Sequence, residues 1–161
     1  MRQRFALSLL VLLSSFLIGF AVSACGTPEL HAVSGEDFAF GKDLEAQSRE
    51  FMALYEEIKL TPEQEAIKKA ALEQLPAPCC SDNTAYTCCC PCNLSLTVWG
   101  MSAHLIANLG YDAEQVKTKA EEWFALTTQG SHTGDACYTG GCMKGFSNNG
   151  CGGMSPHQLK T

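Results

Sequence analysis

The feature that most constrains this chain is a dense run of cysteines, from Cys79 to Cys92, followed directly by an apolar helical pattern. Six of the ten cysteines lie in this run, which reads Cys-Cys-Ser-Asp-Asn-Thr-Ala-Tyr-Thr-Cys-Cys-Cys-Pro-Cys. Packing a core does not require six neighbouring thiols. The run is therefore expected to bind a soft metal ion, to exchange electrons or to form disulfides.

The first residues of the chain have the pattern of a secretory signal. Arg2 and Arg4 precede an apolar stretch, residues 6–21, that is too short for a comfortable membrane span and ends in small residues. The next four residues, Val22-Ser23-Ala24-Cys25, resemble a bacterial lipobox, which implies lipidation of Cys25. An ordinary signal peptide with a cysteine beside its cleavage site is the alternative. We therefore expect residues 1–24 to be removed and the protein to be a lipid-anchored, extracytoplasmic protein of the bacterial cell envelope, where disulfides can persist.

The charge of the mature chain excludes some partners. Without Arg2 and Arg4 it has 9 basic residues, 11 minus 2, against 17 acidic residues, a net charge of −8. An acidic surface repels nucleic acid and anionic lipid. We expect no nucleic-acid partner, and contact with the membrane through the N-terminal lipid alone.

Beyond residue 43 the apolar residues are spaced as in amphipathic helices. One helix is expected from Leu44 to Ile58, and another begins at Thr61-Pro62-Glu63-Gln64, which has the residues of a capping box with proline at the first helical position. A third helix is expected from Asn93 to Asn108, with Gly110 after its end. A fourth is expected from Asp112 to Gly130.

The pattern predicts a mainly α fold, a small bundle of about four helices with an irregular end rich in cysteine and glycine. Residues 25–42 are expected to be a flexible tether and residues 43–161 a single domain. Gly100 interrupts the third helix at a cost of about 1 kcal/mol relative to alanine, so a close neighbour is expected there. No convincing β-strand is found. The glycine-rich segment from Gly130 to Gly153 contains three cysteines and is expected to be fixed by metal or covalent bonds.

The nine cysteines after Cys25 are candidate metal ligands. An odd number leaves at least one thiol outside any disulfide set, and three consecutive cysteines are awkward partners for one another. Thiolates select Cu(I) and Zn(II) over hard cations. Because the tail also contains Met and His beside its cysteines, copper is expected first and zinc second. The candidates are Cys79, Cys80, Cys88, Cys89, Cys90, Cys92, Cys137, Cys142 and Cys151.

Pro91 favours an extended backbone at Cys90, so alternate side chains should point the same way. Cys88, Cys90 and Cys92 are expected to converge at the positive end of the following helix as primary ligands, with Cys89 turned away. The three downstream cysteines are expected to lie beside them. Weaker candidates for copper ligands in the tail are His132, Met143, Met154 and His157, whereas His31 and His104 are expected to be ordinary histidines.

A thiol–disulfide protein is the main alternative. Cys89-Cys90-Pro91-Cys92 is a Cys-x-x-Cys sequence at a predicted helix start, and Cys89 and Cys92 would be its redox pair. A thioredoxin-like protein also needs a strand before this motif and a βαβ framework, neither of which is predicted. A domain cross-linked by disulfides, without metal, is the third possibility. No motif of an ordinary enzyme is present, which favours a protein without catalytic activity.

The lipobox together with Cys88-x-Cys90-x-Cys92 loosely resembles a family of bacterial lipoproteins named for a Pro-Cys-Tyr-Cys-Gly-Cys motif. Thr87, Cys89 and Pro91 stand where that motif has Pro, Tyr and Gly. The resemblance implies an envelope-anchored protein with a cysteine cluster. We expect the chain to bind a soft metal for storage, delivery or sensing.

Overall fold

The structure, a computed structural model, describes residues 38–128 and 137–161, all of which belong to one structural unit, Ala32–Thr161. The expected signal sequence, the lipidation site Cys25, most of the tether, His31 and His132 lie outside the described residues. So does the predicted helix end at Gly130. The described part of the chain is mainly helical, which confirms the predicted fold class.

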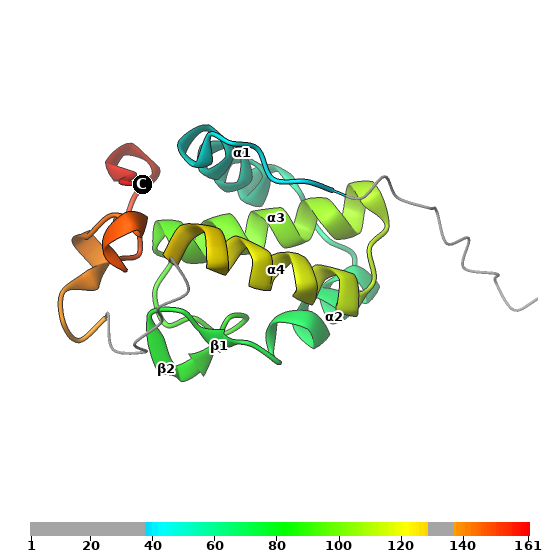
Figure 1. Cartoon of the computed structure of the whole chain (residues 1–161). Helices are drawn as coiled ribbons and strands as arrows, with labels where there is room; N and C mark the ends of the chain where they lie inside the picture. Colours follow the sequence, from blue (N-terminus) through cyan, green and yellow to red (C-terminus); the bar gives the residue numbers. More distant parts are fainter. Residues whose placement is uncertain (1–37, 129–136) are drawn as a thin grey trace, which may run out of the picture. The chain divides into compact units, whose positions relative to one another are not determined.

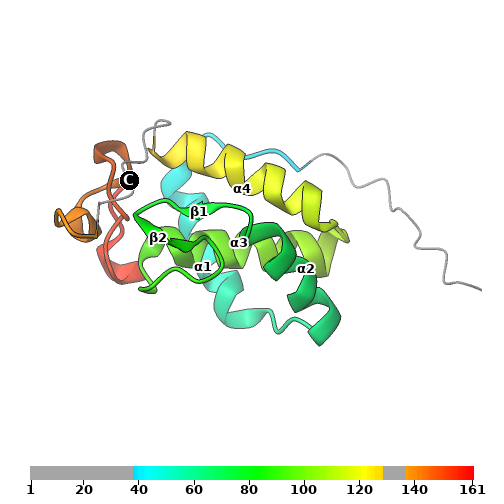
Figure 2. The ribbon, with the colours of Figure 1, turned by 90° about the horizontal axis from the view of Figure 1, so that it is seen from below.

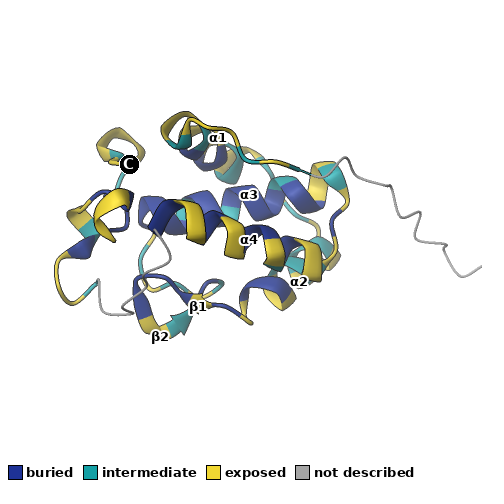
Figure 3. Ribbon diagram, viewed as in Figure 1, coloured by how far each residue is buried: buried dark blue, intermediate teal, exposed yellow. Residues whose placement is uncertain are grey.

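The long helix α3 (Asn93–Leu109) is the centre of the bundle. It contacts α1 (Leu44–Glu57), α2 (Pro62–Leu72) and α4 (Ala113–Thr128), and its residues are buried along most of its length (Figures 1 and 3). A helix that is apolar on nearly every side needs neighbours on nearly every side. The other helices bury one face each against it or against one another.

The helices begin and end close to the predicted positions because short-range capping defines their ends. The Asp43 carboxylate accepts from the Ala46 N–H at the start of α1. Thr61 and Gln64 form the predicted capping box of α2. Asp112 caps α4 by accepting from two backbone N–H groups. Gly110 ends α3 at a φ of 69°, a conformation that glycine adopts without strain.

Gly100 marks the closest approach between α3 and α1. A Cβ atom at this position would collide with the Phe51 carbonyl and would press on the Tyr55 backbone N. Backbone atoms cannot move aside as a flexible side chain can. This confirms that a close neighbour is the reason for a glycine in the middle of a buried helix.

An aromatic cluster fixes the first described residues to the bundle. Phe38 and Phe40, which lie in the predicted tether, pack against Phe51, and Phe40 also packs against Trp123. The Phe38 N–H donates to the Tyr111 hydroxyl at 2.8 Å. The chain from Phe38 onward therefore contacts the helical domain directly.

A short hairpin follows α2 and contains the first part of the cysteine run. The expectation that the chain has no strand was therefore wrong. Strands β1 (Pro76–Ala77) and β2 (Cys80–Thr84) are antiparallel, with an irregular register between Pro76 and Ala77. The two prolines flanking Ala77 favour the extended backbone that pairing needs. The strands are too short to produce a detectable alternation of apolar and polar residues.

The C-terminal segment follows the last helix as three single 3-10 turns, η1 (Gly141–Met143), η2 (Phe146–Asn148) and η3 (Pro156–Gln158). In both views the segment lies at the end of the bundle where α3 begins (Figures 1 and 2). Two backbone hydrogen bonds fix it there, from Asn93 N to Gly153 O at 2.9 Å and from Leu94 N to Cys151 O at 3.0 Å. None of the helices in the described residues is long and apolar enough to cross a membrane.

We predict that Gly100→Ala lowers the free energy of unfolding by about 1–3 kcal/mol, because the added methyl group forces the α1 and α3 backbones apart. Urea unfolding followed by circular dichroism measures the change. Gly41→Ala is the matched control, since a Cβ there meets only the Gln47 side chain at ordinary contact distance. Equal unfolding midpoints for the two variants would contradict the close approach.

Candidate metal centre

The cysteine run enters α3 through a tight turn at Pro91. The Cys92 N–H donates to the Cys90 carbonyl at 2.8 Å, which closes a three-residue turn. Cys92 is then the N-cap residue of α3, with an extended backbone. The Ser95 hydroxyl donates to the carbonyls of both Cys90 and Cys92 and so holds the turn against the first turn of the helix.

Cys79, Cys88 and Cys92 form an inner group, in which all three sulfur atoms lie within 4.8 Å of one another. The Sγ atoms of Cys79 and Cys88 are 3.9 Å apart. Cys79 is 2% exposed and Cys92 is fully buried. The three side chains border a small cavity of about 10 Å³, whose other walls include Leu94, Val98 and Phe124.

Cys151, from the C-terminal segment, adjoins the inner group. It is fully buried, and its thiol is near enough to Cys79 and Cys92 to shift the pKa of both. The hydrogen bond between the Cys151 carbonyl and the Leu94 N–H holds it beside the start of α3. A fourth sulfur thus reaches the inner group from more than fifty residues downstream of Cys92.

Cys89, Cys90 and Cys137 form an outer group, again with all sulfur atoms within 4.8 Å. The Cys89–Cys90 and Cys90–Cys137 sulfur distances are 3.8 and 3.9 Å. Cys89 is exposed, whereas Cys90 and Cys137 are partly buried. The thiol of Cys142, also partly buried, is near enough to Cys137 to raise its pKa.

Cys80 lies at the edge of the outer group. Its sulfur accepts from the Asn83 amide at 3.4 Å, and it is also within hydrogen-bonding reach of Cys89. The hydrogen bonds from Asn83 and from the backbone at Asp82 lower the pKa of the Cys80 thiol. The Tyr138 hydroxyl donates to Asp82 at 2.6 Å, which raises the pKa of Tyr138 to about 12.

The structure divides the cysteines differently from the predicted alternation. Cys90 does not share a group with Cys88 and Cys92, because the turn at Pro91 interrupts the extended backbone that alternation requires. Cys79, which was not among the three expected primary ligands, belongs to the inner group. The proposed redox pair, Cys89 and Cys92, falls into two different groups.

The predicted meeting of the cysteine run with the downstream cysteines is confirmed. Cys137 contacts the outer group, and Cys151 adjoins the inner group. The other described candidates in the tail are placed differently from these cysteines. Both groups consist of cysteine alone, and the side chains of Met143, Met154 and His157 are exposed. The His104 ring is hydrogen-bonded to Asn108 on α3, as an ordinary histidine would be.

Protons are unequally distributed within the inner group. Hydrogen bonds from Cys151, Cys79 and Cys88 lower the pKa of the Cys92 thiol far below its usual value. The pKa values of two neighbouring thiols shift upward: interactions with Cys151 and then Cys92 raise that of Cys79, and interactions with Cys79 and then Cys92 raise that of Cys88. Cys92 is therefore the thiolate of the group, surrounded by protonated neighbours.

The pKa values of three further thiols, those of Cys90, Cys137 and Cys151, are also raised. Burial, followed by the hydrogen bond to Cys89, raises the pKa of Cys90, and burial raises that of Cys137 to about 11. For Cys151 the hydrogen bond with Cys79 lowers the pKa, but the bond to Cys92 and burial outweigh it, so the net shift is upward.

The geometry suits metal binding by thiolates. All nine cysteines in the described residues are free thiols. With metal–sulfur bonds of about 2.3 Å, ligand sulfurs lie about 3.8 Å apart in a tetrahedral site and about 4.0 Å apart in a trigonal one. The measured distances of 3.8 and 3.9 Å match these values and far exceed a sulfur–sulfur bond of about 2.05 Å. Both groups could hold a metal ion.

Comparison of the chain with known protein families, with curated proteins and with solved structures finds no match.

We predict that the reduced, metal-free protein loses stability as the pH rises from 8 to 11. Thiols with raised pKa values remain protonated in the folded state but ionise near pH 9 in the unfolded chain. Above that pH the ionisation of the unfolded chain lowers the free energy of unfolding progressively. The contribution of Cys137 is fully present below pH 9 and is lost as the pH rises through about 11. The depressed pKa of Cys92 acts only at lower pH, where its contribution is lost as the pH falls.

Urea unfolding at several pH values measures this effect. Cys137→Ser is the control variant, because it removes one titrating group from the partly buried set, and its stability should fall less steeply above pH 9. A free energy of unfolding that rises between pH 9 and 11 would contradict the proton distribution described above.

Proposed function

We propose that this protein is a lipid-anchored, extracytoplasmic protein that binds a soft metal ion, copper before zinc, for storage, delivery or sensing. The observation that carries the proposal is the presence of two groups of three cysteines whose sulfur atoms lie within 4.8 Å of one another. Cysteines from the run before α3 and from the C-terminal segment contribute to this cluster.

The arrangement favours metal over disulfides. Each sulfur of a group has two near neighbours rather than one, whereas a disulfide uses only one partner for each sulfur. An odd number of thiols also leaves one outside any complete pairing. A shared metal ion uses all three sulfurs of a group at once.

Copper is placed before zinc because of the number of mutually close sulfurs. Structural zinc sites almost always have four ligands, whereas Cu(I), the softer ion, is satisfied by two or three thiolates and tolerates thiolates shared between ions. Each group has three sulfurs in mutual reach.

The location rests on the sequence of residues 1–25. The basic start, the short apolar stretch and the lipobox-like Val22-Ser23-Ala24-Cys25 support export followed by lipidation of Cys25. An exported chain would acquire its metal after folding outside the cytoplasm. The resemblance to lipoproteins with a Pro-Cys-Tyr-Cys-Gly-Cys motif supports the same location.

We predict that residues 26–161, purified without oxygen, contain at least one copper or zinc ion per chain and nine free thiols once the metal is removed. Elemental analysis and thiol counting measure both quantities. A chain in which Cys89, Cys90 and Cys137 are replaced by serine should bind less metal and keep its helical circular dichroism spectrum. Four disulfides without metal would contradict the proposal, and insulin reduction by the purified protein would support the thiol–disulfide alternative instead.

A further inference from the structure

The two cysteine groups differ in access to solvent. In the inner group Cys79 is 2% exposed, Cys92 is fully buried and Cys88 is partly buried, and the adjoining Cys151 is fully buried. In the outer group Cys89 is exposed and the other two cysteines are partly buried. An ion bound by the outer group would therefore be easier for an incoming ligand to reach, through Cys89, than an ion in the inner group.

The inner group is also closed sterically. Its cavity of about 10 Å³ has room for one atom the size of a water oxygen, and apolar side chains of α3 and α4 form part of its wall. The C-terminal segment covers the group, because its carbonyls at Cys151 and Gly153 are hydrogen-bonded to the first N–H groups of α3. Separation of this segment from the helix would move Cys151 away from the group, so release of an ion held there would be slowed by these hydrogen bonds.

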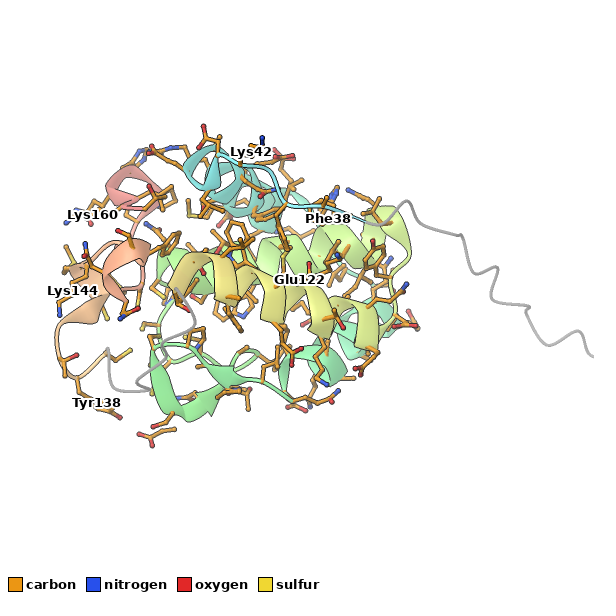
Figure 4. All side chains as sticks on the ribbon, viewed as in Figure 1. Phe38, Lys42, Glu122, Tyr138, Lys144 and Lys160 are labelled. Atoms are coloured by element: carbon orange, nitrogen blue, oxygen red, sulfur yellow. The ribbon has the colours of Figure 1, made fainter. Side chains whose placement is uncertain are left out.

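The outer group lies at the edge of the molecule. Tyr138, next to Cys137, projects outward beside the hairpin and is 71% exposed (Figure 4). The hydrogen bond from Tyr138 to Asp82 is exposed as well. An acceptor could approach Cys89 without disturbing the helical bundle.

The two groups are neighbours rather than separate sites. The Cys137 N–H donates to the Cys79 carbonyl at 3.0 Å. Cys79 belongs to the inner group and Cys137 to the outer group. This backbone hydrogen bond therefore holds the two groups next to each other.

We propose that the protein holds two soft metal ions with unequal lability, one retained by the three cysteines of the inner group, beside Cys151, and one exchanged at the three cysteines of the outer group, beside Cys142. This division rests on the proposed metal-binding function. The acceptor for the exchanged ion is a partner with an exposed soft donor, a thiolate or a thioether, which can reach Cys89.

Exchange at the outer group is a ligand substitution without electron transfer. Where the acceptor's donor is a thiol, it loses its proton as its sulfur forms a bond to the metal; where the donor is a thiolate or a thioether, which has no proton to lose, the proton taken up by Cys89 comes from solvent water. The bond between the metal and Cys89 breaks, and the Cys89 sulfur takes up one proton. The oxidation state of the metal does not change, and the remaining sulfurs of the outer group follow in turn.

Metal exchange kinetics test the division. Residues 26–161, which contain the whole unit Ala32–Thr161, are loaded with two equivalents of Cu(I) under anaerobic conditions and challenged with an excess of a chromogenic Cu(I) chelator. We expect two phases of equal amplitude, the second at least about tenfold slower because the hydrogen bonds of the C-terminal segment to α3 oppose its local opening. The double variant Cys89→Ser, Cys142→Ser should retain one ion and show the slow phase alone.

Ser147→Ala, a substitution elsewhere in the C-terminal segment, is the control and should show both phases. Alkylation adds a second readout: with one equivalent of Cu(I), Cys89 should still react with iodoacetamide, and with two it should be protected. A single phase for all bound metal, or a fast phase that persists in the double variant, would overturn the division while leaving metal binding intact. Failure of the unmodified chain to bind Cu(I) or Zn(II) would instead overturn the proposed function.

Discussion

The structure of the cysteine cluster depends on the first N–H groups of α3. The first turn of any helix has backbone donors without intrahelical partners, and burial makes it costly to leave them unpaired. Here the Asn93 and Leu94 donors are paired with carbonyls of Gly153 and Cys151, so the C-terminal segment completes the helix. Each such bond contributes about 1 kcal/mol net. The same contact brings the cysteines of the tail to the cysteine run, so capping of the helix and assembly of the cluster are one event.

Asn93 and two glycines make this contact specific. The Asn93 amide donates to the carbonyls of Gly152 and Ser155, both at 2.8 Å, from a fully buried position. Gly152 and Gly153 have φ values of 75° and 101°, where a Cβ would be strained and would also meet Phe146 or Gln158. The glycines that make the tail look irregular in sequence therefore serve a close approach to α3. Nothing in the periodicity of the sequence singles out Asn93, whose position directly after Cys92 was the only available signal.

The helices could be predicted because their signals are local. Thr61 and Gln64, only three positions apart, form the capping box of α2. A glycine in the middle of a helix, as at Gly100, indicates a close neighbour by its position alone. The partition of the cysteines could not be predicted, because it depends on the turn from Cys90 to Cys92 and on contacts between residues far apart in the chain. Proline restricts the residue before it, but that preference does not specify where the side chains point once the chain turns. The hairpin could not be predicted either, since strands of two and five residues are too short to show a periodicity.

The proton distribution explains why a buried set of thiols is compatible with a stable fold. Cys92 lies at the N-terminus of α3, where the helix dipole favours negative charge, and its thiolate accepts hydrogen bonds from three neighbouring thiols. One negative charge is thus stabilised, and the remaining sulfurs stay neutral. Metal binding by thiolates releases protons. An ion that entered the inner group would therefore take the place of the thiol protons next to Cys92. The sulfur positions would change little, because the hydrogen-bonded distance of 3.9 Å between Cys79 and Cys88 is already that of two ligands of one ion. The metal-free fold therefore already holds the sulfurs of the inner group near the positions that a bound metal ion would require.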